Sequence, residues 1–336
     1  MFIILNENIY NFNMKKNLLF FSSLKLYLLI SLFLTNSINS KLINQKIHIA
    51  YGLDNKYTYP TLVSMISILE NASNDTFYTF YLLVEKHLFK EENKIKLKHL
   101  EEKYDRCKVI IFELTNENLS NARVNRYPMA AYYRLLLADL IPDVNRVIYL
   151  DGDTIVFTDL AEMNNLEMNN NIILGFVDNS FKNAEQFGIK TYKYVTSGVL
   201  LINLKKMRKE NISKKFFKFI DDNKKNLEQE DQTVINIVLH GRIDLLPPKF
   251  GMWNFVNRDD VIKHNNYGDK KLNIKAYNEK EFLKAWKIPS ILHFVRAKPW
   301  KRKTKHTHRE FHEKWWYYAQ KSDEFENILR FYGGKK

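Results

Sequence analysis

The residues best suited to chemistry in this chain are two carboxylates separated by a glycine, Asp151-Gly152-Asp153. They follow Val147 to Leu150, a short apolar run typical of a strand buried on both faces of a sheet. Ligands of open α/β sheets bind beyond the carboxyl ends of the strands, where unpaired carboxylates would repel each other. Because carboxylate oxygens suit hard divalent cations, the motif indicates a site for Mn²⁺ or Mg²⁺, with a polar turn as the alternative. Gly152 is expected to let the backbone bend so that both acids face one ion.

Strands and helices alternate in the chain before this motif. Strands are expected at residues 47–51, 78–84 and 107–114. Helices are expected over residues 60–69, 90–104 and 129–140, where the last helix carries Arg134 and the second has Ile95, Leu97 and Leu100 as its apolar positions. The alternation predicts an α/β, Rossmann-like domain with a mainly parallel central sheet and helices on both faces.

Glycine-rich phosphate-binding motifs are missing from this alternating region. Neither Gly-x-Gly-x-x-Gly nor a Walker-type loop occurs in the sequence, so a dehydrogenase-like dinucleotide fold and a P-loop ATPase are disfavoured. If a nucleotide binds, a metal ion on the two acids would hold its phosphates. Beyond Asp153 we expect strands at residues 172–177, 199–204 and 291–294, with Ser197-Gly198 just before the second of these, and a helix over residues 228–240.

Composition limits the classes of function. The chain has 336 residues, of which 45% are hydrophobic, so it can bury a large core. Its single cysteine, Cys107, is expected in a buried strand and excludes an intrachain disulfide and a cysteine-based zinc site. The net charge of +14 suits an anionic partner, or reflects a general Lys/Asn-rich bias. We find no recognisable nucleic-acid-binding motif, so nucleic acid is not the expected partner.

The N-terminus has the pattern of a targeting segment. Two lysines at Lys15 and Lys16 precede the mostly apolar residues 17–34, which Lys25 interrupts, and residues 35–40 are polar. Residues 1–40 are therefore predicted to be a signal peptide or a signal anchor, and residues 41–336 one folded domain. This would place the protein in the secretory pathway, in the lumen of the endoplasmic reticulum or Golgi, or outside the cell. A retained anchor would make it a single-pass type II protein associated with the membrane through its N-terminus.

Five short blocks occur in a fixed order between Ile47 and Trp316. They comprise residues 49–57, 132–153, 197–204, 231–236 and 293–300. Each block alone is a weak signal, but their order and separations together resemble glycosyltransferase family 8, the retaining nucleotide-sugar transferases of the GT-A fold. The resemblance implies a metal-dependent hexosyltransferase that moves glucose or galactose from a UDP-sugar to a glycan, glycoprotein or glycolipid.

The resemblance also implies roles for particular residues. It implies Asp151, Asp153 and His293 as ligands of Mn²⁺ or Mg²⁺, with Asp151 also contacting the donor. Before the resemblance is considered, His293 would be interpreted as a core histidine. Lys298 would place a point charge at the diphosphate, and Gly198 would lie in the strand beside the donor sugar.

Further roles concern the base and the sugar of the donor. Asp54 and Tyr57 would hold the uracil by hydrogen bonding and stacking, with Arg134 near the same donor site. Gln232 would approach the anomeric carbon, where an amide suits positioning better than nucleophilic attack, and Asp231 would contact sugar hydroxyls. The structural alternatives are a turn cap for Asp54, packing for Tyr57, a buried ion pair for Arg134, a helix N-terminal acid for Asp231 and a solvated helix residue for Gln232.

The sequence departs from the family pattern at two places. Thr196 stands where the family has Asn, which bears on the identity of the donor sugar. The segment from His293 to Lys298 is one residue shorter than the family pattern and lacks its glycine, so Arg296 is an alternative cation for the diphosphate. These departures motivate an alternative function, a catalytically degenerate member that binds UDP or sugar. The implied metal ligands are all retained, which favours an active enzyme over a degenerate one.

Overall fold

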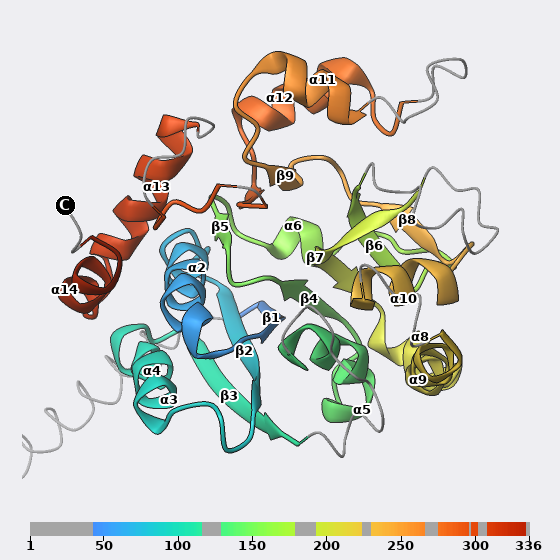
Figure 1. Ribbon diagram of the computed structural model, residues 1–336, viewed down its shortest axis with the longest axis horizontal. Coiled ribbons are helices and arrows are strands. Elements are labelled where there is room, and N and C mark those ends of the chain that lie inside the picture. Colours follow the sequence, from blue (N-terminus) through green and yellow to red (C-terminus); the bar gives the residue numbers. More distant parts are fainter. Residues whose placement is uncertain are drawn as a thin grey trace, which may run out of the picture. The chain divides into compact units, whose positions relative to one another are not determined.

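The computed structural model describes residues 43–115, 129–178, 193–223, 230–265, 275–295, 297–301 and 308–333 (Figure 1). Contacts divide the chain into Met1–Asn44 and Gln45–Lys336, and every helix and strand described below lies in the second unit. The predicted signal peptide or anchor in residues 1–40 lies outside the described residues and stays a prediction. Among the helices that are described, none is long and apolar enough to cross a bilayer.

A seven-stranded sheet forms the centre of the fold, with the strand order β3-β2-β1-β4-β7-β6-β8 (Figure 1). Its neighbouring strands are parallel except around β7, which runs antiparallel to both β4 and β6. The predicted mainly parallel α/β sheet is confirmed. The strands are β1 (Gln45–Gly52), β2 (Thr76–Glu85), β3 (Cys107–Leu114), β4 (Val147–Leu150), β6 (Ile173–Val177), β7 (Val195–Ile202) and β8 (Ile243–Leu245).

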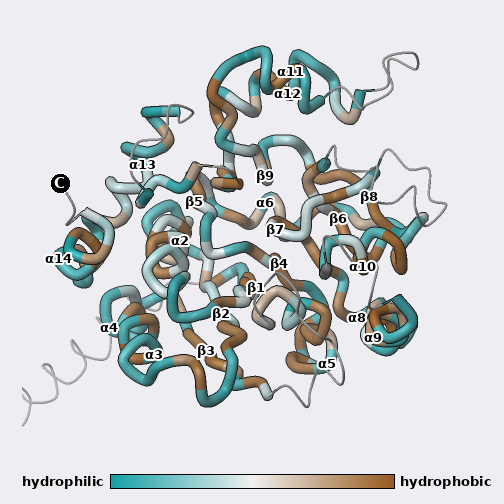
Figure 2. The backbone as a smooth tube through the Cα atoms, viewed as in Figure 1, coloured by the Kyte–Doolittle hydropathy of each residue, from teal (hydrophilic) through white to brown (hydrophobic). Residues whose placement is uncertain are grey.

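Two hydrophobic clusters lie on the two faces of this sheet, because successive side chains of a strand point to opposite faces. In β1, Ile47 and Ile49 belong to one cluster and Ala50 to the other. Apolar stretches in Figure 2 accordingly follow the central strands. Helices contributing to the first cluster are α2 (Thr58–Glu70), α3 (Glu91–Lys98), α4 (Leu100–Lys103), α6 (Ala161–Asn164), α11 (Arg258–Asn265), α12 (Glu279–Lys287), α13 (Arg309–Gln320) and α14 (Phe325–Ile328), which η4 (Leu329–Gly333) follows. Those contributing to the second are η3 (Met129–Leu136), α5 (Leu137–Leu140), α8 (Leu204–Lys209), α9 (Ile212–Asn223) and α10 (Glu230–Val238).

A second, three-stranded sheet joins segments that are far apart in the chain. It consists of β5 (Thr154–Val156), β10 (Ile291–His293) and β9 (Phe250–Trp253), in the order β5-β10-β9. His293 is paired with Thr154 on one side and with Trp253 on the other. The pairing brings Asp153, which directly precedes β5, to a histidine 140 residues later in the chain.

Hydroxyl groups of α2 fix β5 in place. Ser67 Oγ accepts a hydrogen bond from the Val156 amide at 2.9 Å, and Ser64 Oγ lies 2.9 Å from Thr154 Oγ1. These side chains are buried, so each polar group has its partner inside the protein. The helix that follows β1 therefore also positions the strand that follows Asp153.

Three local expectations differ from the structure. The predicted helix over residues 129–140 consists of the 3₁₀ helix η3 and the short α-helix α5. The predicted helix over residues 90–104 divides into α3 and α4, and Ile95 is 63% exposed rather than an inward apolar position. Asn93 and Leu97, four residues apart, face inwards, so Ile95, two residues from each, points to the opposite side. Ser197-Gly198 lie inside β7 rather than before it, because the strand begins at Val195. Cys107 is buried in β3 as predicted.

Candidate active site

The predicted site residues gather at one edge of the central sheet. The parallel strands β1, β4 and β6 end there, and the antiparallel strand β7 begins there, so Asp151 and Asp178 each follow a strand end. The Asp151 amide donates to the Gly198 carbonyl at 2.8 Å, and the Asp178 amide donates to the Tyr194 carbonyl at 2.9 Å. A cleft of about 370 Å³ lies at this edge. It is lined by every predicted site residue except Gly198, namely Asp54, Tyr57, Arg134, Asp151, Asp153, Asp231, Gln232, His293 and Lys298.

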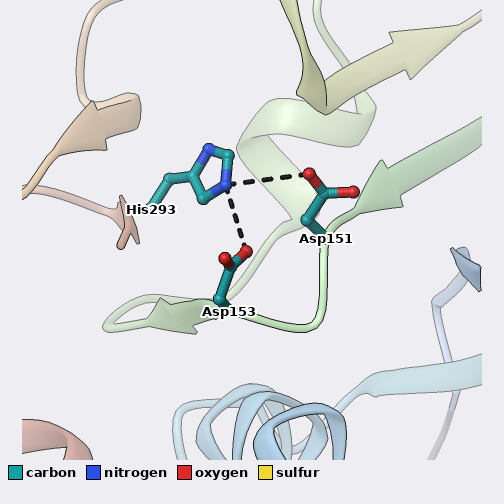
Figure 3. A group of neighbouring side chains, drawn as sticks. All are labelled: Asp151, Asp153 and His293. Atoms are coloured by element: carbon teal, nitrogen blue, oxygen red, sulfur yellow. Dashed lines mark hydrogen bonds and ion pairs between the residues drawn. The ribbon is translucent and has the colours of Figure 1, made fainter. Parts of the chain in front are cut away.

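Asp151, Asp153 and His293 converge on one point (Figure 3). His293 Nε2 lies 3.1 Å from Asp153 Oδ1 and 3.7 Å from Asp151 Oδ2. One potential ligand atom from each residue lies within 4.8 Å of the others. Two carboxylate oxygens and one imidazole nitrogen form a donor set that suits Mn²⁺ well and Mg²⁺ less well. The three residues thus fit a divalent metal ion.

Gly198 leaves the space in which this cluster sits. A Cβ atom at residue 198 would lie 2.3 Å from His293 Cε1 and 2.6 Å from Asp151 Oδ2. The other imidazole nitrogen, His293 Nδ1, is buried and has no hydrogen-bond partner among the described residues. His293 and Asp151 therefore pack directly against residue 198, where only glycine fits.

Gly152 serves a different purpose from the expected one. It is absent from the glycines with positive φ in the described chain, so no unusual backbone bend requires glycine here. A Cβ atom at residue 152 would instead lie 2.3 Å from Thr61 Oγ1 on α2. The glycine between the two acids allows the turn to approach the helix closely.

Arg134 is buried and held from several sides. Its Nη2 lies 3.1 Å from Asp151 Oδ1, and its Nε lies 3.2 Å from Asp231 Oδ2. Nη1 donates to the Ser197 carbonyl, and the guanidinium carbon lies 4.2 Å from the centre of the Tyr149 ring. The buried ion pair considered as an alternative is therefore present, and it holds Asp151 through Oδ1, while His293 lies nearer to Oδ2.

Lys298 neutralises the second acid of the motif. Its ammonium group donates to Asp153 Oδ2 and to the Phe294 carbonyl. Burial alone would raise the pKa of Asp153, but the charge of Lys298 and the hydrogen bond and charge of His293 outweigh it and hold the pKa well below the usual range. Asp153 is thus strongly stabilised as a carboxylate.

Helix α10 carries Asp231 and Gln232 to the cleft. Asn236, one turn further on, accepts from the Val195 amide and donates to the Val195 carbonyl, both at 2.8 Å, and so anchors the helix on β7. The Gln232 side chain accepts from the Ser197 amide at 3.2 Å and donates to Asp178 Oδ2 at 2.9 Å. Burial raises the pKa of Asp231 against the opposing charge of Arg134. Gln232 is therefore a firmly held cleft residue, not a solvated one.

Asp54 and Tyr57 form the wall beside β1. Asp54 caps the short helix η1 (Asn55–Tyr57), because its Oδ1 accepts from the Lys56 amide at 2.9 Å and the Tyr57 amide at 3.1 Å. The Tyr57 ring meets the Trp300 ring edge-on, with centroids 6.3 Å apart. The turn cap considered for Asp54 is thus real, while both side chains also line the cleft.

Asp178 and Trp253 also line the cleft and were not predicted from the sequence. Asp178 follows the apolar strand β6 as Asp151 follows β4, and that shared pattern was available in the sequence. Trp253 is the last residue of β9 and gives no such signal; the parallel pairing with His293 places it in the cleft wall. Arg296, the alternative cation for the diphosphate, lies outside the described residues.

A mainly parallel sheet with an Asp-x-Asp cluster at its carboxyl edge defines an enzyme of the GT-A glycosyltransferase class. The chain belongs to glycosyl transferase family 8, whose family model matches residues 48–304. The resemblance noted from the five blocks is thereby confirmed.

Relatives and solved structures agree with this assignment. A putative glycosyltransferase of Haemophilus influenzae is 29% identical over 233 residues, covering 66% of this chain and 68% of the relative. The lipopolysaccharide 1,2-glucosyltransferase of Escherichia coli is 27% identical, covering 67% of this chain and 68% of the relative. The galactosyltransferase LgtC, solved with donor and acceptor sugar analogs, has a TM-score of 0.68 at 21% identity, covering 84% of this chain and 100% of LgtC. That last likeness shows the GT-A fold.

Proposed function

We propose that this glycosyltransferase is a metal-dependent, retaining enzyme that transfers glucose or galactose from a UDP-sugar. The observation that carries the proposal is the convergence of Asp151, Asp153 and His293 on one point at the edge of the cleft. Lys298 and Arg134 flank this cluster and bring positive charge to the same place. A hard-cation site with positively charged side chains beside it suits a diphosphate.

We place the nucleotide-sugar in the cleft of about 370 Å³. We place the uracil against Tyr57, whose position Asp54 fixes through the hydrogen bonds that cap η1. Asp151, Asp153 and His293 would hold Mn²⁺ or Mg²⁺. When bound, the divalent ion supplies Lewis-acid stabilisation of the negative charge that grows on the leaving diphosphate. Arg134 holds Asp151 in position for that ion.

Gln232 is the residue that we assign to the anomeric carbon. Asp178 and the Ser197 amide hold its side-chain amide, so it is oriented before the substrate arrives. An amide is a poor nucleophile, which makes substitution on one face, with Gln232 positioning the sugar, more economical than double displacement. Asp231 lies behind Arg134 in an ion pair, so we assign it a positioning role toward the sugar hydroxyls.

The acceptor is proposed from the relatives' names and from the cleft wall. Two relatives are named as lipopolysaccharide glucosyl- and galactosyltransferases, so among glycan, glycoprotein and glycolipid acceptors a glycolipid comes first. Trp253 and Val295 are among the apolar side chains that line the cleft. An aromatic face of this kind suits the apolar face of a saccharide ring.

The test is UDP release from a panel of UDP-sugars by the full chain, with Mn²⁺, with Mg²⁺ and with EDTA. Slow hydrolysis of UDP-glucose or UDP-galactose that EDTA abolishes is the expected result. Asp151→Asn should lose the release while Asp105→Asn, an exposed surface acid, retains it. Equal release in EDTA would contradict the metal dependence. Binding of UDP without turnover of any donor would support the non-catalytic alternative.

A further inference from the structure

Each carboxylate of the Asp-x-Asp motif contacts a cationic side chain of the protein. Arg134 contacts Asp151, and the Lys298 ammonium contacts Asp153 Oδ2. The other oxygen of Asp153 lies 3.1 Å from His293 Nε2. Both oxygens of Asp153 are therefore engaged by protein donors, and a metal ion on this carboxylate must displace or share them.

The backbone on either side of Lys298 is held by hydrogen bonds, while its side chain lines the cleft. Asn254 donates to the Ala297 carbonyl at 2.9 Å, and the indole of Trp316 donates to the Pro299 carbonyl at 3.2 Å. The Lys298 side chain is 15% exposed and lines the cleft. A lysine ammonium is a point charge on a flexible four-carbon stem. It can leave Asp153 for another anion in the cleft without a change in the backbone.

We propose that Lys298 competes with the metal ion for Asp153 in the donor-free enzyme and moves to the donor's diphosphate when metal and donor bind. The inference rests on the proposed function, since it requires a metal ion on Asp153 and a diphosphate in the cleft. Lys298 then has opposite effects in the two states. It weakens metal binding when the cleft holds no nucleotide and strengthens nucleotide binding when the metal is present.

A coupling between the two ligands follows from this exchange. Metal binding releases the ammonium that the diphosphate uses, and the diphosphate in turn keeps the ammonium away from Asp153. By thermodynamic linkage, each ligand must tighten the binding of the other by the same factor. Lys298 contributes to this factor in addition to any direct contact between metal and diphosphate.

The test is isothermal titration calorimetry of Mn²⁺ and of UDP with the full chain and two variants. Lys298→Met removes the ammonium and keeps an unbranched stem. Lys301→Met removes the same charge from an exposed position three residues further on. Without UDP, Lys298→Met should bind Mn²⁺ about tenfold more tightly than the wild type, as expected for loss of a competing charge-assisted hydrogen bond. In saturating Mn²⁺ it should bind UDP about tenfold more weakly, and Lys301→Met should match the wild type in both titrations.

Two outcomes would overturn the inference. If Lys298→Met binds Mn²⁺ without UDP no more tightly than Lys301→Met, Lys298 does not compete for Asp153. EDTA-sensitive UDP release by the wild type would in that case still support the proposed function. If none of the three proteins binds Mn²⁺, with or without UDP, the inference and the metal-dependent function fail together.

Discussion

Two cations contact the Asp-x-Asp motif, Arg134 at Asp151 and Lys298 at Asp153, and the structure holds them differently. Arg134, from η3 over the central sheet, is 6% exposed, contacts two carboxylates and two carbonyls, and stacks on Tyr149. Lys298, from the segment after the small sheet, is 15% exposed and contacts one carboxylate and one carbonyl. The arginine is fixed by its surroundings, while the lysine can change partner.

The difference indicates that Arg134 and Lys298 have different roles in the cleft. A planar guanidinium that satisfies several acceptors at once is suited to hold a template of carboxylates. An ammonium on a flexible stem is suited to follow charge that arrives with a substrate. We expect substitutions on the Arg134 side to cost stability as well as activity, and substitutions on the Lys298 side to change ligand binding chiefly.

The largest effect should come from Asp153→Asn, which removes the acid shared by the metal site and Lys298. We expect kcat/KM for sugar transfer to fall on the order of 10³-fold, the scale of removing a group that stabilises charge in the transition state. The fold should remain, since the amide has the same shape. Steady-state transfer assays and thermal melting measure the two quantities. Transfer within a few-fold of the wild type would show that Asp153 is not a ligand.

Gly198→Ala should separate the converging side chains without removing any of them. The added methyl group would overlap His293 and Asp151, so we expect Mn²⁺ affinity to fall by on the order of 10²-fold, as for a metal site that loses its geometry. Calorimetric titration with Mn²⁺ measures this. Gly241→Ala is the control for a methyl group without steric overlap, because the Cβ position of Gly241 has open space, although its φ of +78° adds backbone strain there. Equal Mn²⁺ affinity in both variants would contradict the packing role of Gly198.

Arg134→Met and Lys298→Met should differ in stability. Loss of Arg134 leaves Asp231 buried without its counter-charge, so we expect a decrease of about 3 kcal/mol in the free energy of unfolding. Loss of Lys298 should cost about 1 kcal/mol, because Asp153 keeps His293 Nε2 at 3.1 Å and the lysine contacts one carboxylate where the arginine contacts two. Urea denaturation without metal compares them. Equal losses would remove the distinction between a fixed and an exchangeable cation.

Swapping the two cation types should give a smaller, asymmetric effect. Arg134→Lys loses the fork that reaches two carboxylates and should reduce kcat/KM about tenfold, as for the loss of a charge-assisted hydrogen bond. Lys298→Arg keeps the charge and should stay within about threefold of the wild type. Transfer assays at several donor concentrations measure both. A greater loss in Lys298→Arg than in Arg134→Lys would reverse the comparison.

Cys107 offers a probe of the fold away from the cleft. Burial, together with the charges of Glu101 and Asp105, raises the pKa of its thiol to about 12. At pH 8.5 the native thiol should therefore be alkylated on the order of 10³-fold more slowly than a free cysteine, since the thiolate is the reactive form. Iodoacetamide labelling followed by mass spectrometry measures the rate. Faster labelling in Arg134→Met than in Lys298→Met would confirm that the former opens the fold.

Much of the fold could be predicted because its strands and helices follow from local patterns of apolar and polar residues. The apolar run before Asp151 predicts a buried strand, and β4 is buried at all of its residues. Period-2 and helical patterns located the strands and helices of the first half within a few residues. The predictions were wrong where packing decides which side of a helix is buried. Ile95 is an example, because its apolar side chain is exposed to solvent.

The site was less fully predictable, because its parts come from distant segments. The five-block resemblance supplied Asp151, Asp153, His293, Arg134 and Lys298 as candidates. It could not show that Arg134 contacts Asp231, or that Lys298 lies on Asp153 and not apart from it. Trp253 gave no local signal at all. It lies in the cleft because it pairs with His293, 40 residues later in the chain.

The sequence by itself determined the class of fold, the family and the chemical types of the site residues, because strand and helix periodicity, the Asp-Gly-Asp spacing and the block order are all local features. Tertiary structure decided which charges neutralise each other and which side chains pack so closely that the neighbouring residue must be glycine. Those properties depend on distances between β4, β7, β10 and the segment that carries Lys298. Such distances arise only when the two sheets pack together, since ion pairs and steric overlap act over a few ångströms and not along the chain.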